Sequence, residues 1–270
     1  MRGIKNKFSE SSSAERKVFI PFVTAGDPDL ETSFEIVMAL TECGADIIEL
    51  GVPFSDPMAD GPTIQASSQR ALLNGTTLCD VLELVRQIRQ RSDVPIVLFS
   101  YLNPLFRYGL DKLAIDAAKV GVDGVLVTDA IDDEAKVISA ILRSRDLDLI
   151  SLIAPTTSDE RLRTITASAS GFIYAISRAG VTGARAETSN AAEVLVGRAR
   201  KLTDLPIAVG FGISTRTQIE NVWKYADAAV VGSAIVAEID RSISTGNVVD
   251  NVKTFVTMLV PAVAKDAVDI

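Results

Sequence analysis

Histidine is absent from this sequence of 270 residues. Its absence excludes histidine-containing catalytic triads, histidine-ligated zinc and the imidazole general base of many acid–base enzymes. Acid–base chemistry must therefore come from carboxylates, lysine, tyrosine or cysteine. Cysteine is also scarce, and Cys43 and Cys79 are too few and too far apart for a disulfide framework or a zinc site. We expect both to be buried free thiols in a reducing compartment.

Long apolar runs are absent as well. No run reaches the roughly 18 residues that a membrane span requires, and the polar segment 1–17 has no signal-peptide core. We therefore expect a cytoplasmic protein. Positive charge is in deficit, because the formal net charge is −8, which argues against nucleic acid or an anionic membrane as the main partner. A small anionic substrate stays compatible, since backbone N–H groups can hold a phosphate within an acidic protein.

The rest of the chain alternates between two kinds of segment. Short apolar runs rich in β-branched residues have the composition of strands buried on both faces. The predicted strands are Val18–Val23, Asp46–Leu50, Pro95–Phe99, Gly124–Val127, Leu147–Leu152, Phe172–Ile176, Pro206–Val209 and Ala228–Val231. Longer stretches with helical spacing of apolar residues lie between them. The predicted helices include Leu30–Glu42, Asp80–Gln90, Leu110–Lys119, Asp133–Arg145, Ala191–Lys201 and Thr215–Tyr225.

This alternation predicts an α/β fold, a (β/α)8 TIM barrel. Such a barrel needs about 250 residues, so residues 1–270 fit a single domain, although composition alone also allows two smaller ones. Extra helices are expected at the N-terminus, as an insertion at Ile64–Leu73 and as a closing helix at Asn247–Ala264. An open doubly wound sheet is the alternative. It rarely has eight evenly spaced strands, and no GxGxxG motif follows the first strand.

Glu49 is a carboxylate inside the second predicted strand. By alternation its side chain points the same way as that of Ile47, toward either the barrel interior or the helix layer. In barrel enzymes the active site lies at the C-terminal ends of the strands. A carboxylate at that end of the interior would be desolvated, which favours the protonated form and suits a general acid–base. The alternative is a structural ion pair with a neighbouring Lys or Arg.

Asp60 ends the loop that follows this strand. Its position directly before Gly61 and Pro62 is typical of a helix N-cap, and spacing alone favours that structural interpretation. However, Glu49 and Asp60 come from one strand and the loop after it, so both carboxylates can also converge on one pocket.

Glycines follow three consecutive strands in the last third of the chain. They occur in Ser177–Arg185, in Gly210–Ser214 and in Val231–Ala234, and the last of these opens a helix with Gly-Ser. One such glycine is usually an ordinary turn residue. Glycine-lined exits of the last strands together with a helix N-terminus, however, form the phosphate site of many barrels. The sequence therefore predicts a phosphate site here.

Several of these segments together resemble one known family, the tryptophan synthase α subunits. The resemblance extends from about Phe19 to Ile235 in the same order and spacing. The segments that carry it are Pro21–Pro28, Glu49–Gln65, Ala154–Thr157, Ser177–Gly183 and Gly210–Ile213. The family's members are lyases with the barrel fold, which cleave indole-3-glycerol phosphate into indole and glyceraldehyde 3-phosphate.

The resemblance implies roles for particular side chains. Glu49 would be the acid–base that protonates the indole ring carbon bearing the side chain and then accepts a hydroxyl proton. Asp60 would hydrogen-bond the indole N–H and stabilise the positive charge that develops on the ring. The substrate-binding residues would be Phe22 and Phe211 beside the indole ring, the pocket tyrosine Tyr174, and Thr182, which would bond Asp60 on loop closure. Backbone N–H groups to the phosphate would come from Gly183, Gly212, Gly232 and Ser233.

The resemblance also implies a partner. Asp56 and Pro57 lie in a loop similar to the family's contact with a β subunit, with which α subunits form an α2β2 complex and to which they pass indole. No metal or organic cofactor is expected on this chain, because pyridoxal phosphate would belong to the partner. Two departures from the family pattern are Ala130-Ile131, in place of an aliphatic residue and proline, and Ser100, where Thr or an aliphatic residue is common.

Other functions stay open at this point. One is a stand-alone indole-releasing lyase of the same family, which the altered loop at Ala130-Ile131 favours slightly. Another is a catalytically weak α-like protein that mainly activates a β subunit, although intact Glu49, Asp60 and Tyr174 argue against it. Phosphosugar isomerases of histidine or tryptophan synthesis share the phosphate glycines but lack the motif that joins Glu49 to Asp60.

Overall fold

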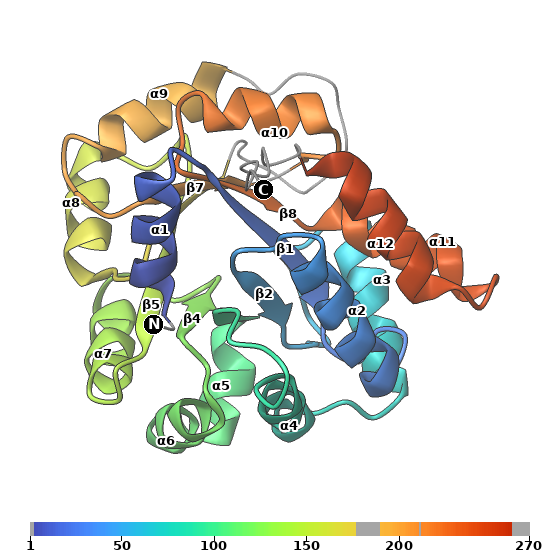
Figure 1. Ribbon diagram of the computed structural model, residues 1–270. Helices are drawn as coiled ribbons and strands as arrows, with labels where there is room; N and C mark the ends of the chain where they lie inside the picture. Colours follow the sequence, from blue (N-terminus) through green and yellow to red (C-terminus); the bar gives the residue numbers. More distant parts are fainter. Residues whose placement is uncertain (1–2, 177–189, 211, 261–270) are drawn as a thin grey trace, which may run out of the picture.

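The computed structural model describes residues 3–176, 190–210 and 212–260. Their strands are parallel and form a closed barrel in sequence order, with helices packed around it (Figure 1). The strands are β1 (Val18–Thr24), β2 (Ile48–Gly51), β3 (Ile96–Ser100), β4 (Gly124–Val127), β5 (Asp148–Ile153), β6 (Ile173–Ile176), β7 (Ile207–Gly210) and β8 (Ala228–Val231). Because β1 pairs with β8, the predicted barrel is confirmed and the open sheet is excluded.

The predicted helices are present with differences near their ends, and α5 and α8 were not among those named from the sequence. They are α1 (Ile4–Ser13), α2 (Leu30–Glu42), α3 (Pro62–Leu73), α4 (Leu78–Ile88), α5 (Leu102–Tyr108), α6 (Leu110–Val120), α7 (Asp132–Arg143), α8 (Asp159–Ser168), α9 (Asn190–Ala199), α10 (Arg216–Trp223), α11 (Ser233–Ile243) and α12 (Val248–Leu259). The inserted helix α3 begins earlier than predicted because Pro62 fits a first helical position. Helix α12 ends earlier, since Val260 precedes a proline and has an extended backbone.

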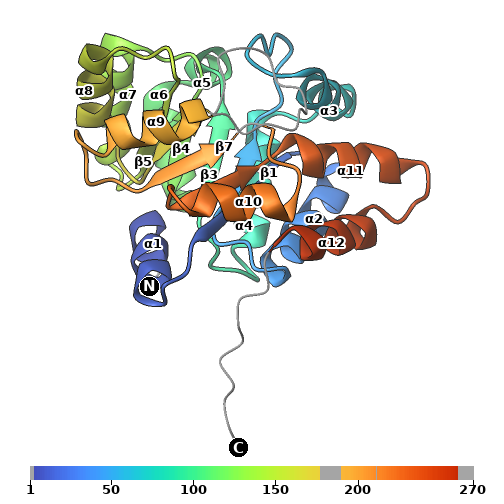
Figure 2. The ribbon, with the colours of Figure 1, turned by 90° about the horizontal axis from the view of Figure 1, so that it is seen from above.

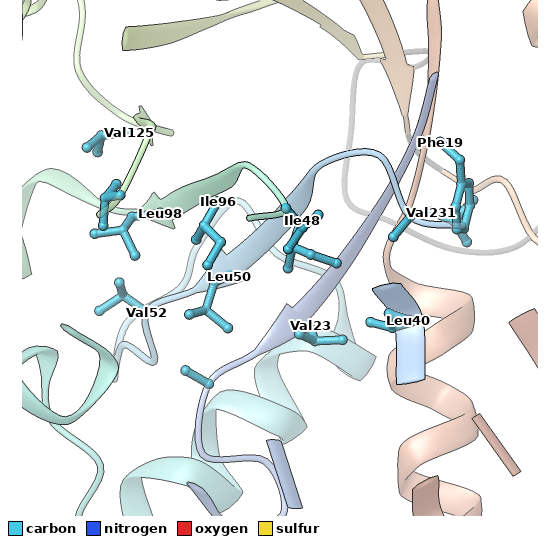
Figure 3. Packing of buried hydrophobic residues seen from close by; sticks show 14 of the residues in the cluster. Phe19, Val23, Leu40, Ile48, Leu50, Val52, Ile96, Leu98, Val125 and Val231 are labelled. Carbon is cyan, nitrogen blue, oxygen red and sulfur yellow. The ribbon is translucent and has the colours of Figure 1, made fainter. Parts of the chain in front are cut away.

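Alternation along each strand separates an inner from an outer core. Outward side chains such as Phe19, Ile48 and Leu50 pack against the helix layer (Figure 3). Inward side chains fill the barrel, and Ile47 is one of them. Glu49 lies two residues further along β2 and therefore also points into the barrel.

Helix α1 closes the N-terminal end of the barrel. Its Ile4 and Phe8 belong to the inner core, and the ring of Phe8 lies 5.8 Å from that of Phe172. Figures 1 and 2 show α1 across one end of the barrel, away from α3 and α11. The C-terminal end, where active sites of such barrels lie, is left for the loops that follow the strands.

Two minor predictions had different outcomes. Both cysteines are free thiols, but Cys79 is exposed and Cys43 is half-buried, so the expectation of burial was wrong. Cys79 lies in the amphipathic helix α4, whose buried face is formed by other residues. Among the residues that the structure describes, no helix is both long and apolar enough to cross a membrane.

Candidate active site

One pocket at the C-terminal end of the barrel collects most of the predicted site residues. It is lined by residues of β1, β2, β3, β6 and β8, of the loops after β2, β7 and β8, and of the first turns of α3 and α11. The lining residues are Phe22, Glu49, Asp60, Ile64, Phe99, Tyr174, Gly212, Val230, Gly232 and Ser233. The predicted residues Thr182, Gly183 and Phe211 lie outside the described residues.

Glu49 is buried in the floor of this pocket. It pairs in register with Phe22 of β1 and Val97 of β3, and only 1% of its surface is exposed. Neither of its carboxylate oxygens has a hydrogen-bond partner among the described residues, so none of the lysine and arginine side chains in that part of the chain forms the alternative ion pair. Burial raises the pKa of Glu49 to about 8. The carboxyl group is therefore mostly protonated at neutral pH and has a proton to donate.

Asp60 lies in the loop above Glu49, and its side chain is half-buried. The N-cap of α3 is Gly61, so the capping interpretation of Asp60 was wrong. The amide of Gln65 donates to the backbone carbonyl of Asp60 at 2.9 Å and holds this residue over the first turn of α3. Burial raises the pKa of Asp60 to about 6, and a hydrogen bond from Tyr101 limits the rise. Asp60 is therefore mostly ionised at neutral pH, unlike Glu49.

Tyr101 is a site residue that sequence reasoning missed. It is buried at the end of β3, and its hydroxyl oxygen accepts a 3.0 Å hydrogen bond from the N–H of Ala59. Its ring lies 5.3 Å from that of Phe54, so it contacts both ends of the loop before Asp60. Burial and the neighbouring Asp60 raise the pKa of Tyr101, which stays protonated and able to donate. Its place at a strand exit, next to Ser100, was the available signal.

The apolar part of the pocket is aromatic. The rings of Phe22 and Phe99 lie 5.2 Å apart in an edge-to-face arrangement, and Tyr174 is buried beside them. Two glycines make room for these rings. A Cβ atom on Gly51 would lie 2.6 Å from the Phe22 ring, and one on Gly210 would lie 2.0 Å from the Tyr174 hydroxyl. A larger residue at either strand end would therefore force the neighbouring aromatic side chain to shift.

We expect Gly210→Ala to lower the free energy of unfolding by about 1–3 kcal/mol, because the buried Tyr174 ring has to shift to admit the new methyl group. Urea unfolding measures the change. Gly197→Ala is the matched control: Gly197 lies within α9 with no described atom near the added Cβ. That exchange should raise stability by about 0.5–1 kcal/mol through helix propensity. Equal effects of the two exchanges would contradict the close approach.

The opposite end of the pocket is suited to an anion. Helix α11 begins at Ser233 with Gly232 as its N-cap, and both residues line the pocket. The first N–H groups of a helix have no acceptor within the helix, and the helix dipole favours negative charge there. Gly212, with φ +77°, has the left-handed backbone that glycine adopts without strain. These groups fit the phosphate site that the sequence predicts.

The loop before Asp60 also exposes apolar surface. Asp56 is exposed, Pro57 is half-buried, and 81% of the surface of Met58 is accessible. Asp56 accepts a hydrogen bond from the hydroxyl of Ser55. The residues predicted to meet a partner are therefore at the surface, on the loop that carries Asp60.

The fold and the site together define a (β/α)8 barrel whose pocket combines two carboxyl groups, aromatic side chains and the N-terminus of a helix. Comparisons with known proteins identify its family. Residues 8–263 match the family model described as tryptophan synthase alpha chain. The tryptophan synthase alpha chain of Citrifermentans bemidjiense is 48% identical over 241 residues, which are 89% of this chain and 90% of that relative.

Solved structures agree with this match. The tryptophan synthase subunit alpha from Legionella pneumophila is 32% identical with a TM-score of 0.87, over 96% of this chain and 97% of that chain. A chain in the tryptophan synthase complex from Pyrococcus furiosus is 38% identical with a TM-score of 0.82, over 90% of this chain and 97% of that chain. The chain belongs to the tryptophan synthase alpha chain family, which confirms the family predicted from the sequence.

Proposed function

We propose that this chain cleaves indole-3-glycerol phosphate into indole and glyceraldehyde 3-phosphate as the α subunit of a tryptophan synthase. The observation that carries the proposal is the pair of carboxyl groups in one pocket. Glu49 is protonated at neutral pH and has no partner among the described residues, whereas Asp60 is mostly ionised. One pocket thus offers a proton donor and a negative charge to the same substrate.

The lining residues support one orientation of the substrate in this pocket. The indole ring lies beside Phe22, Phe99 and Tyr174, where aromatic contact and burial stabilise it. Its N–H points to Asp60, and the phosphate lies at the other end, on the N–H groups of Gly232 and Ser233. This orientation brings the ring carbon that bears the glycerol side chain toward Glu49.

The reaction begins with a proton transfer. Glu49 gives its proton to the side-chain-bearing ring carbon, C3, and becomes a carboxylate. The protonated ring is an indolenine with positive charge on nitrogen. Asp60, ionised and hydrogen-bonded to the ring N–H, stabilises that charge as it develops.

Carbon–carbon cleavage follows and returns the proton. The bond between C3 and the first side-chain carbon breaks, and its electron pair goes back into the ring, which becomes neutral indole. The hydroxyl on the side-chain carbon loses its proton to the Glu49 carboxylate, and the carbon becomes the aldehyde of glyceraldehyde 3-phosphate. Glu49 ends the cycle protonated, so the scheme balances without a metal or an organic cofactor on this chain.

A partner subunit completes the proposal. The related Pyrococcus furiosus chain comes from a tryptophan synthase complex. We assign the contact with a β subunit, in an α2β2 complex, to the loop with Asp56, Pro57 and the exposed Met58. Pyridoxal phosphate would be held by that β subunit. Because the same loop ends at Asp60, binding of the partner can bear directly on the catalytic carboxylate.

The test is indole release from indole-3-glycerol phosphate by the purified chain, alone and with a tryptophan synthase β subunit. We expect slow release by the chain alone and faster release in the complex. Rapid turnover that the partner does not change would replace the proposal by a stand-alone lyase. Activation of the β subunit without indole release would replace it by an activator role, and no indole under any condition would exclude the reaction.

The pKa values predict the pH dependence of kcat/KM. Asp60 has to be ionised and Glu49 has to be protonated, so kcat/KM should fall below about pH 6 and above about pH 8. Asp60→Asn should lower the rate and remove the acidic limb, while the alkaline limb stays. Steady-state rates from pH 5 to pH 9 measure both limbs. A profile that is flat over this range would contradict the assigned protonation states.

A further inference from the structure

Arg70 on α3 makes a three-point contact that the reaction scheme does not use. Its Nε and Nη2 atoms donate to the two carboxylate oxygens of Asp27, at 2.7 and 2.9 Å. Its Nη1 atom donates to Asp240 on α11 at 2.6 Å. Asp27 is buried, with 1% of its surface exposed, whereas Asp240 is at the surface. Arg70 therefore connects the loop after β1, the last turn of α3 and the last turn of α11.

Asp27, the buried partner of Arg70, fixes the position of the guanidinium group on the barrel side. Burial raises the pKa of Asp27, and the Arg70 guanidinium opposes the rise. The hydroxyls of Thr24 and Ser67 lie 2.7 Å apart and join β1 itself to α3. The guanidinium is thus held against the barrel, and its remaining N–H groups are directed outward to α11.

The two helices that Arg70 connects hold opposite ends of the pocket. Helix α3 follows Asp60 directly, and its Gln65 holds the Asp60 backbone. Helix α11 begins at Ser233, at the anion end. The two helices lie side by side in both views (Figures 1 and 2) and pack against each other. Ile64 of α3 and Val236 of α11 belong to one apolar cluster between the helices. Apolar contacts are non-directional, so they restrict sliding of one helix along the other less than the directed hydrogen bonds of a guanidinium group do.

We propose that Arg70 is a positioning residue that sets the spacing between Asp60 and the N-terminus of α11, so that one molecule reaches both. The proposal rests on the proposed function, because it is the intact substrate that joins an indole ring to a phosphate. The spacing matters only to a ligand that spans the pocket. Once such a ligand is bound at Asp60, its contact with the N-terminus of α11 is an intramolecular step, whose strength depends on the distance between the two sites. Indole contacts only the Asp60 end, and glyceraldehyde 3-phosphate contacts only the α11 end.

The test compares KM for indole-3-glycerol phosphate with the separate Kd values of indole and glyceraldehyde 3-phosphate. Asp240→Asn leaves the Arg70–Asp27 pair intact and should raise KM about threefold to fivefold, the range that one exposed ion pair allows. In Arg70→Lys a single ammonium group replaces the planar guanidinium and cannot bond both oxygens of Asp27 and also Asp240. This variant should raise KM about tenfold. In both variants kcat should change less than twofold, and the two Kd values should stay at their wild-type values.

Glu83→Gln is the matched control, because Glu83 forms an exposed ion pair with Arg86 on α4 and does not line the pocket. It should change none of these quantities. Wild-type KM in both Asp240→Asn and Arg70→Lys, or equal weakening of all three ligands, would overturn the positioning role. If Arg70→Lys does not fold, the outcome for Asp240→Asn decides. A wild-type chain that releases no indole would instead overturn the proposed function, so the two failures are distinguishable.

Discussion

Glu49→Gln is expected to lower kcat for indole release by a factor of about 10³–10⁴, because one side chain supplies both proton transfers. A glutamine amide neither donates a proton to the ring carbon nor accepts the hydroxyl proton. Its size matches that of the protonated carboxyl group, and it is equally neutral. KM should therefore change less than twofold. Steady-state indole release by wild type and variant, with the same β subunit present, measures both quantities.

Glu49→Asp separates lost chemistry from lost geometry. Aspartate keeps a carboxyl group in the buried position but withdraws it from the ring carbon by one methylene. We expect a kcat between those of wild type and Glu49→Gln, because misplacement by about 1 Å can cost up to about 10²-fold. A Glu49→Gln variant within tenfold of wild type would show that another group moves the proton. Tyr174, whose pKa burial raises well above its usual value, would then be the neighbour to examine.

The barrel was predictable because the same requirement for a buried strand followed by a helix recurs along the chain. Each parallel strand is buried on both faces, which requires a short apolar run, and each crossover requires a helix. Boundaries were less predictable, because they depend on neighbours that are distant in sequence. Strand β5, for example, is displaced by one residue from its predicted position. Its register with β6 joins Ser151 to Ile173, and sequence periodicity does not contain that information.

The site was predictable as a set of residues and less so as an arrangement. Alternation placed Glu49 on the same side as Ile47, but only closure of the barrel makes that side the interior. The capping rule favoured Asp60 as an N-cap, yet the chain uses Gly61 there. Tyr101 was not predicted as a site residue, because its hydrogen bond with Ala59 joins residues 42 positions apart and local sequence patterns do not reveal such a contact. Local sequence rules thus identified the carboxyl groups of the site, whereas packing between residues distant in sequence determined which side chains contact each other.

The same exchange, Glu49→Gln, is expected to stabilise the folded chain. In the unfolded chain Glu49 titrates near its ordinary pKa of 4.5, and in the folded chain near 8. Between these values the folded state binds one more proton than the unfolded state, so wild-type stability falls as pH rises. Each pH unit costs about 1.4 kcal/mol. At pH 7 the wild-type chain should therefore be less stable than Glu49→Gln by about 3 kcal/mol.

Urea unfolding of both chains between pH 4.5 and pH 8 measures this difference. It should be absent near pH 4.5, where the buried carboxyl group is neutral in both states, and should grow until about pH 8. Glu83→Gln should show no comparable growth with pH, because Glu83 is exposed on α4. A constant gain across the range would mean that the amide packs better, without a raised pKa. A stability gain of Glu49→Gln that grows with pH would show that burying the Glu49 carboxyl group as a proton donor lowers the stability of the wild-type fold.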